Sequence, residues 1–174
     1  MQDWLSKVIH RKRRRVCASL MRTYREISSA SVDELWQKVV DLTDVSWHPL
    51  FKSTNVPLGL VPKPGLIFRA AVRFWPIPIQ IFVERVNPKE MLSIRVLAIP
   101  GIEERITYHI GSTVCGTCVS YSVTLRGWLS PLIWLFSRPY ADRVARSLVE
   151  VVEKTALQAV SGKKKSLNDS CFDF

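Results

Sequence analysis

Apolar and polar residues alternate through the middle of the chain, in short runs that proline, glycine and asparagine residues separate. A period of two is typical of strands with one buried face, and gaps of hairpin length join neighbouring strands. The sequence therefore predicts an antiparallel meander rather than alternating strands and helices. The runs are Leu66–Trp75, Ile77–Asn87, Met91–Ile99, Glu103–Ile110 and Thr117–Leu125.

The alternation gives these five strands one apolar face and one more polar face, which predicts a half-exposed sheet. We find no Asp, Glu or His among the residues assigned to the apolar face. Such a face favours holding an apolar molecule over transforming one. The assigned residues are Phe68, Ala70, Val72, Phe74, Ile77, Ile79, Ile81, Val83, Leu92, Ile94, Val96, Ala98, Ile106, Tyr108, Ile110, Val119, Tyr121, Val123 and Leu125.

A strand and a helix are expected before these runs. Residues 16–28 are rich in residues that suit a strand. Ser31 and Glu34 have the spacing of a capping box, in which each side chain binds the backbone N–H of the other residue. Apolar residues then recur with helical spacing from Val32 to Val40. The segment Trp47–Phe51 predicts a short second helix or a turn.

A longer amphipathic helix follows the last strand. Ser130 and Pro131 are typical of an N-cap and of the first helical position. Pro139 predicts a kink, and Gly162 predicts the end of the helix. One face of this helix should cover the apolar face of the sheet. The residues expected there are Ile133, Phe136, Tyr140, Val144, Leu148, Val151 and Thr155.

The order of these elements resembles the SRPBCC superfamily, which contains START lipid-transfer domains, Bet v 1-like proteins and polyketide cyclase/dehydrase-like proteins. Ala30–Trp36, Trp47, Val83–Pro88 and Val123–Gly127 carry the likeness. The resemblance implies an α+β helix-grip fold: a curved antiparallel sheet of about seven strands, in the order β1-α1-α2-β2–β7-α3, around a long C-terminal helix. It also implies an apolar cavity between sheet and helix. The superfamily includes carriers, sensors and enzymes, so the likeness implies no single activity.

Charge is distributed unevenly along the 174 residues, whose net charge is +10. Residues 1–15 hold six Lys or Arg and one Asp, a net +5, and we interpret them as a basic N-terminal arm. Residues 16–160 form the ligand-binding domain, and residues 161–174 a C-terminal tail. The arm suits an amphipathic basic helix on an anionic membrane, a solvated tail, or contact with nucleic acid or protein.

Several features bear on location and cofactors. No segment reaches the roughly 18 apolar residues that span a bilayer, and the first residues lack a signal-peptide pattern. We expect a cytoplasmic protein, with peripheral membrane contact. Cys115 and Cys118 form a C-x-x-C pair in a predicted hairpin, which favours a structural role over a disulfide, redox or metal role. No metal or cofactor is expected.

The predicted cavity and the predicted surface contacts involve separate residues. The residues around Trp128–Phe136 are apolar around most of a helix, so some of them should face a membrane, a partner or the cavity entrance. The expected membrane or anion contacts are Arg11, Lys12, Arg13, Arg14, Arg15, Trp128 and Trp134. The expected cavity residues are Trp47, Phe68, Val72, Phe74, Ile79, Ile81, Ile94, Val96, Ile106, Tyr108, Val119, Tyr121, Val123, Ile133, Phe136 and Tyr140.

Few residues suggest catalysis. His48 is a conceivable general base near the cavity mouth, because an imidazole titrates near working pH. Tyr108 and Tyr121 are either core residues or polar anchors for a ligand. We therefore predict a carrier or sensor of a hydrophobic small molecule or lipid, acting at a membrane surface. The alternatives are a cyclase- or aromatase-like enzyme in the same cavity, and interaction through the basic arm.

Overall fold

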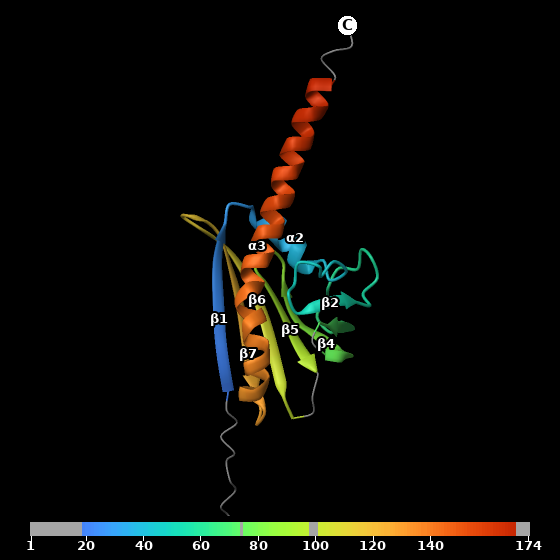
Figure 1. The fold of residues 1–174 in the computed structure, drawn as a ribbon, viewed down its shortest axis with the longest axis vertical. Helices are drawn as coiled ribbons and strands as arrows, with labels where there is room; N and C mark the ends of the chain where they lie inside the picture. The colour runs from blue at the N-terminus through green and yellow to red at the C-terminus, as the bar shows by residue number, and fades with distance from the viewer. Residues whose placement is uncertain (1–18, 74, 98–100, 170–174) are drawn as a thin grey trace, which may run out of the picture.

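A computed structural model describes residues 19–73, 75–97 and 101–169, and within them a single seven-stranded antiparallel sheet lies against one long helix (Figure 1). The expected helix-grip architecture is thus present. The elements are β1 (Ser19–Ser28), α2 (Val32–Val40), β2 (Phe51–Thr54), β3 (Ile67–Val72), β4 (Trp75–Asn87), β5 (Met91–Leu97), β6 (Glu103–Thr113), β7 (Gly116–Arg126) and α3 (Ser130–Asp169).

The strand order is β1-β7-β6-β5-β4-β3-β2, so β2 to β7 form the expected meander. Strand β1 does not pair with β2, the next strand along the chain. It pairs with β7, from Ser19 opposite Arg126 to Ser28 opposite Thr117. This pairing places the beginning of β1 beside the end of β7. Because α3 follows β7 closely, the beginnings of β1 and α3 lie at the same end of the sheet.

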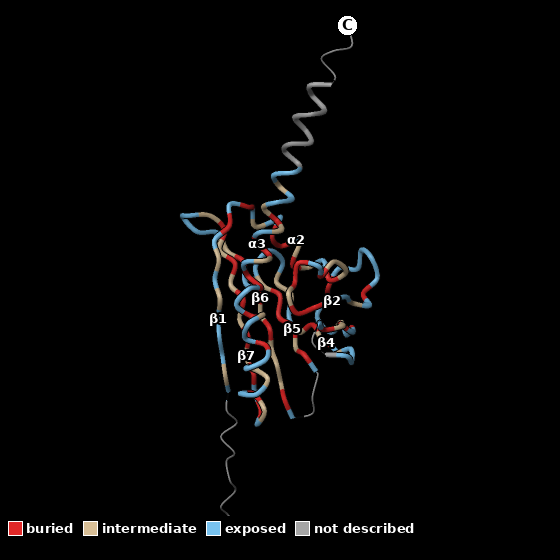
Figure 2. The backbone as a smooth tube through the Cα atoms, viewed as in Figure 1, coloured by how far each residue is buried: buried red, intermediate tan, exposed pale blue. Residues whose placement is uncertain are grey.

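The alternation assigned the inner face of the sheet correctly where the structure describes it. Ile81, Ile94 and Tyr121 are buried, as are most of the other assigned residues, and buried positions recur along the strands (Figure 2). Ile77 is the clear exception, because it is 62% exposed near the beginning of β4. Phe74 and Ala98 lie outside the described residues.

The outer face of the sheet carries an ion-pair network instead. The Glu84 carboxylate lies between two guanidinium groups, with Arg95 Nε at 2.7 Å and Arg105 Nε at 2.7 Å. Glu103 lies 3.5 Å from both arginines. Arg95 therefore points outward, as the alternation predicted.

Helix α3 packs against the core along most of the expected stripe, including Ile133 and Val151, and further residues beside that stripe are also buried. Val144 and Leu148 are buried as predicted, whereas Phe136 and Thr155 are exposed. Ala141 and Ala145 add to this contact, because a helix can approach a sheet more closely where its side chains are short. Counting large apolar residues misses such positions. The buried apolar residues of α3 are Ala141, Val144, Ala145, Leu148, Val149 and Val152.

The ends of α3 also differ from expectation. The helix runs through Gly162 to Asp169 rather than ending at the glycine. One glycine inside a helix costs only about 1 kcal/mol relative to alanine, so it does not suffice to end one. Pro139 lies within the helix, and the Oγ of Ser130 has no hydrogen-bond partner in the described part of the chain, so it does not act as the expected cap.

One helix, α2, lies between β1 and β2, and its capping box forms as predicted. Ser31 Oγ accepts from Glu34 N at 3.2 Å, and Ser31 N donates to the Glu34 carboxylate at 2.8 Å. The segment that follows forms turns, so the second helix of the resemblance is replaced by a turn around Trp47.

A carboxylate on α3 fastens the end of β1. Glu153 Oε1 accepts from Ser28 Oγ and Ser29 N, both at 2.9 Å, and from Ser29 Oγ at 3.1 Å. The hydrogen bond from the Ser29 backbone, followed by that from the Ser28 side chain, holds the pKa of Glu153 below its usual range. This contact joins the edge strand to the helix.

Replacing this carboxylate should destabilise the protein at neutral pH. We expect Glu153→Ala to lower the free energy of unfolding by about 1–2 kcal/mol in urea titrations, because hydrogen bonds to a charged group are lost. The loss should shrink as the pH falls through the lowered pKa of Glu153, since the protonated group accepts more weakly. Glu150→Ala, an exposed glutamate on the same helix, is the control and should change little. Equal losses from both variants would contradict this role.

Candidate functional site

A cavity of about 530 Å³ lies between the inner face of the sheet and the first turns of α3. Strands β3 to β6 and the segment entering β2 supply one wall, and α3 supplies the other. The described residues of the wall are apolar except for Glu104, Ser137 and Tyr140. The lining residues are Leu50, Phe51, Val72, Ile79, Val96, Ile102, Glu104, Ile106, Ile133, Leu135, Phe136, Ser137, Pro139 and Tyr140.

The predicted cavity residues divide into two groups. Those near the beginning of α3 line the cavity: Val72, Ile79, Val96, Ile106, Ile133, Phe136 and Tyr140. The others fill the closed core beneath the middle of α3 and beside α2: Trp47, Phe68, Ile81, Ile94, Tyr108, Val119, Tyr121 and Val123. Phe74 lies outside the described residues. Alternation identifies the face of a strand but not which part of that face the helix covers.

The sequence interpretation overlooked one residue in the cavity wall, Glu104. It lies on β6 in the same alternation as Ile106 and Tyr108, so extending that strand's pattern by two positions would have found it. Our expectation of an inner face without acidic residues was therefore wrong. Burial raises the pKa of Glu104 to about 7, although the cavity leaves the residue partly exposed to solvent.

His48 is buried in the core rather than placed at the cavity mouth, and only 1% of it is exposed. Its Nδ1 accepts from the backbone N–H of Leu50 at 3.2 Å, so the proton of a neutral ring must be on Nε2. Nε2 then donates to the Tyr108 hydroxyl at 2.9 Å. Desolvation, and secondarily the charge of Arg73, lower the pKa of His48 to about 3, so the ring stays neutral.

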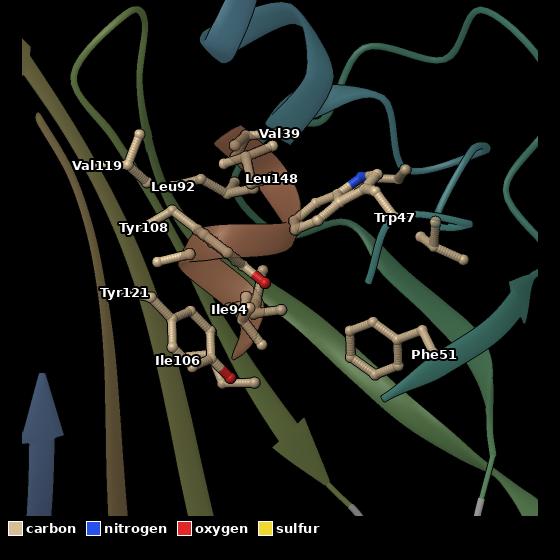
Figure 3. Packing of buried hydrophobic residues seen from close by; sticks show 14 of the residues in the cluster. Val39, Trp47, Phe51, Leu92, Ile94, Ile106, Tyr108, Val119, Tyr121 and Leu148 are labelled. Atoms are coloured by element: carbon tan, nitrogen blue, oxygen red, sulfur yellow. The ribbon is translucent and has the colours of Figure 1, made fainter. Parts of the chain in front are cut away.

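Aromatic rings surround this hydrogen bond. His48 stacks on Phe51 with ring centres 4.3 Å apart, and Tyr108 lies 5.2 Å from Tyr121. Figure 3 shows both tyrosine rings in the packed interior beside Ile94 and Ile106. Burial raises the pKa of both phenols. His48, Tyr108 and Tyr121 are not among the cavity-lining residues. They lie in the packed core next to the cavity wall.

The two tyrosines differ in their polar contacts. The Tyr108 hydroxyl accepts from His48, whereas the Tyr121 hydroxyl is buried and has no hydrogen-bond partner within the described residues. Tyr108 thus forms a hydrogen-bonded pair with His48, whereas Tyr121 contributes mainly through the packing of its ring.

The end of the sheet near the cavity carries exposed apolar side chains. Trp128 is 75% exposed, Leu135 69% and Phe136 60%, and the last two also line the cavity. Trp134 is half-buried. The predicted anion contacts Arg11, Lys12, Arg13, Arg14 and Arg15 lie outside the described residues. Within the ranges described above, no helix has the length and hydropathy to cross a bilayer.

The C-x-x-C pair belongs to the predicted hairpin, with Cys115 in the turn between β6 and β7 and Cys118 within β7. Cys115 is exposed, Cys118 is half-buried, and both are free thiols. The part of the chain that the structure describes contains no group of three or more His, Cys, Asp or Glu side chains suited to a metal ion.

Comparison with solved structures identifies the fold. The chain is similar to Ara h 8.0201, with a TM-score of 0.62 and 10% identity over 79% of this chain and 99% of that one. Protein MLL2253 from Mesorhizobium loti gives 0.61 and 15%, over 79% of this chain and 98% of that one. The fold is the Bet v 1-like helix grip. No protein-family model matches the sequence, and no curated protein does.

The helix-grip structures that resemble this chain include an enzyme. Norcoclaurine synthase from Thalictrum flavum, as a point mutant with a transition-state analogue, gives a TM-score of 0.55 and 14% identity, over 80% of this chain and 98% of that one. At such low identity the similarity concerns the fold alone. The function of this chain must be argued from its own cavity.

The polar pair behind the cavity yields a stability prediction. Tyr108→Phe leaves the buried Nε2–H of His48 without an acceptor, and we expect it to lower the free energy of unfolding by about 1–3 kcal/mol. Tyr121→Phe removes a hydroxyl that has no partner in the described residues, so its cost should be much smaller. Chemical denaturation of both variants measures the difference. A larger loss for Tyr121→Phe would contradict the assignment.

A second prediction concerns Glu104 and pH. With its pKa raised to about 7, Glu104 keeps its proton in the folded state at pH values where the unfolded chain has lost it. The folded state therefore loses stability as pH rises from about 4.5 to about 7. Glu104→Gln removes this loss, so the variant should exceed the wild type by on the order of 1–3 kcal/mol at pH 8, but not at pH 4. A pH-independent difference in urea titrations would refute this linkage.

Proposed function

We propose that this protein binds a hydrophobic small molecule or lipid in the cavity between the sheet and α3. The observation that carries the proposal is the cavity wall, in which apolar side chains from both the sheet and the helix face a common space of about 530 Å³. This volume lies in the range of cavities that hold drug-sized ligands.

The binding energy would come mainly from removal of apolar surface from water. A ligand that buries about 200 Å² of apolar surface gains roughly 5 kcal/mol at 25 cal/mol per Å². The wall is supported from behind by the packed core, including Ile94 and Tyr108. Part of the binding site is therefore preformed, which reduces the entropy lost on binding.

The second candidate is an enzyme of the cyclase or aromatase kind. Glu104 favours it, because a carboxyl group with a pKa near 7 can both give and take a proton at neutral pH. The neighbouring His48–Tyr108 pair does not reach the cavity, so Glu104 is the strongest proton-transfer group in the described wall. Binding requires only the apolar wall, whereas catalysis requires several reactive groups placed around the substrate. We therefore favour a carrier or sensor.

We further propose that the cavity is loaded at an anionic membrane. Exposed Trp128, Leu132 and Leu135 lie at the end of the sheet where α3 begins. Ser19 lies at the same end, since it pairs with Arg126. Arg15 is four residues from Ser19 and is therefore within about 14 Å of it along an extended chain. Basic residues beside an apolar surface combine attraction to anionic lipid with insertion of side chains.

Ligand binding can be tested with a neutral fluorescent naphthylamine probe, N-phenyl-1-naphthylamine. The substitution Ile106→Trp adds side-chain volume within the cavity and should weaken probe binding by about tenfold, or ~1.4 kcal/mol. The control His109→Trp lies on the outer face of the same strand and should bind like the wild type. Probe binding that Ile106→Trp leaves intact in a folded variant would overturn the cavity as the binding site.

Membrane contact can be tested by co-sedimentation with vesicles of phosphatidylcholine and phosphatidylserine. Deleting residues 1–15, or combining Trp128→Ser with Leu132→Ser, should reduce binding severalfold, because charge attraction and insertion act together. The control combines Leu58→Ser with Val61→Ser, two exposed apolar residues in the loop between β2 and β3. Equal loss in the control, or retention of RNA rather than vesicles by the arm, would contradict the proposal.

A further inference from the structure

Glu104 contributes the one acidic side chain in the described cavity wall. Strand β6 positions it opposite Val96 of β5 and Leu125 of β7, both of which are buried. Its alternation with Ile106 directs the side chain to the inner face, where the cavity gives solvent access to it. The carboxylate is thus held among apolar side chains at the wall of a space large enough for a ligand.

Two other carboxylates in the described part of the chain have partners that Glu104 lacks there. Glu84 binds Arg95 and Arg105, and Glu153 accepts three hydrogen bonds from serines. No hydrogen bond or ion pair reaches Glu104 within the described residues. An ionised group in apolar surroundings loses much of its hydration, so an unpartnered carboxylate destabilises the empty protein.

No cation of the described structure is placed to neutralise Glu104. Among the described residues of the cavity wall there is no Lys or Arg, and the neighbouring Arg105 is directed to Glu84 on the outer face. The titratable groups that face it are the phenols Tyr108 and Tyr121 from the sheet and Tyr140 from α3. Burial raises the pKa of Tyr108 and Tyr121, so both phenols are uncharged at neutral pH and do not compensate a negative charge.

We propose that Glu104 makes this cavity select amphiphiles that carry a basic amine together with an apolar tail. The ammonium group would donate charge-assisted hydrogen bonds to the carboxylate, which are stronger than neutral ones. The Ser137 hydroxyl, in the opposite wall on α3, is buried and has no partner in the described residues, so it offers a second acceptor. The apolar tail would lie along the remaining wall.

The same charge disfavours fatty acids. A ligand carboxylate beside an ionised Glu104 places two negative charges in surroundings of low polarity, so one of them must take up a proton to bind. An alcohol of equal length provides a neutral reference because it has the same tail. The net charge of the whole chain is +10, which attracts acids and repels amines, so a preference for the amine cannot come from overall charge.

The proposal rests on the apolar cavity as the binding site, and calorimetry with three twelve-carbon probes separates the two claims. Dodecylamine, dodecanol and dodecanoic acid are titrated into the full chain at pH 8, below the micelle concentrations of the amine and the acid and below the solubility limit of the alcohol. At this pH Glu104 is ionised and the amine is protonated. We expect the amine to bind about tenfold more tightly than the alcohol, and the acid most weakly.

The variant Glu104→Gln should bind amine and alcohol with similar affinity and should bind the acid more tightly than the wild type does. The matched control is Glu103→Gln, which changes the adjacent glutamate on the outer face and should preserve the wild-type order. Dodecanol binding without a preference for the amine, or a preference that survives in Glu104→Gln, would overturn the amine selection alone. Failure of the wild type to bind any of the three would overturn the cavity proposal, and this inference with it.

Discussion

The structure depends on a mismatch in width between one helix and one sheet. An α-helix with its side chains is about 10 Å across, whereas seven strands spaced about 4.8 Å apart are nearly three times as wide. Helix α3 contacts β1 and β7, so it leaves much of the inner face to other segments. Helix α2 and the turn around His48 cover one part of that face. The part that they do not fill is the cavity, which therefore follows from the architecture.

Much of this fold could be predicted from the sequence because strand alternation is a local signal. The face of the sheet on which Ile94 or Val123 lies can be inferred from the alternation of apolar and polar residues within two positions on either side. The position of α3 could not be predicted in the same way, since it depends on how closely Ala141 and Ala145 approach the sheet. The division of inner residues between cavity and core depends on that contact. Glu104 escapes this prediction for a different reason: it is charged and lies near the beginning of β6, before the first apolar residue of that strand.

Two polar groups of the interior, His48 and Glu104, differ in whether they have hydrogen-bond partners. His48 satisfies both ring nitrogens through Leu50 and Tyr108, which stabilises a neutral imidazole in the core. Glu104 has no such partner among the described residues, and its burial opposes ionisation. A polar pair whose hydrogen bonds are satisfied contributes to stability and to a unique packing. An unsatisfied polar group at a cavity reduces stability, and it places an ionisable group in an otherwise apolar wall.

The pairing of β1 with β7 also constrains how the chain reaches its native state. Strand β1 precedes the other strands of this sheet in the chain and, because Ser19 pairs with Arg126, it has no partner until nearly all of the sheet has been synthesised. Closing so long a loop costs entropy before any contact compensates for it, which slows folding. Until β1 adds to the sheet, the edge of β7 exposes unpaired backbone groups that can pair with another chain. Addition of β1 pairs that edge of β7 and makes β1 the edge strand, whose end is fastened to α3 by Glu153.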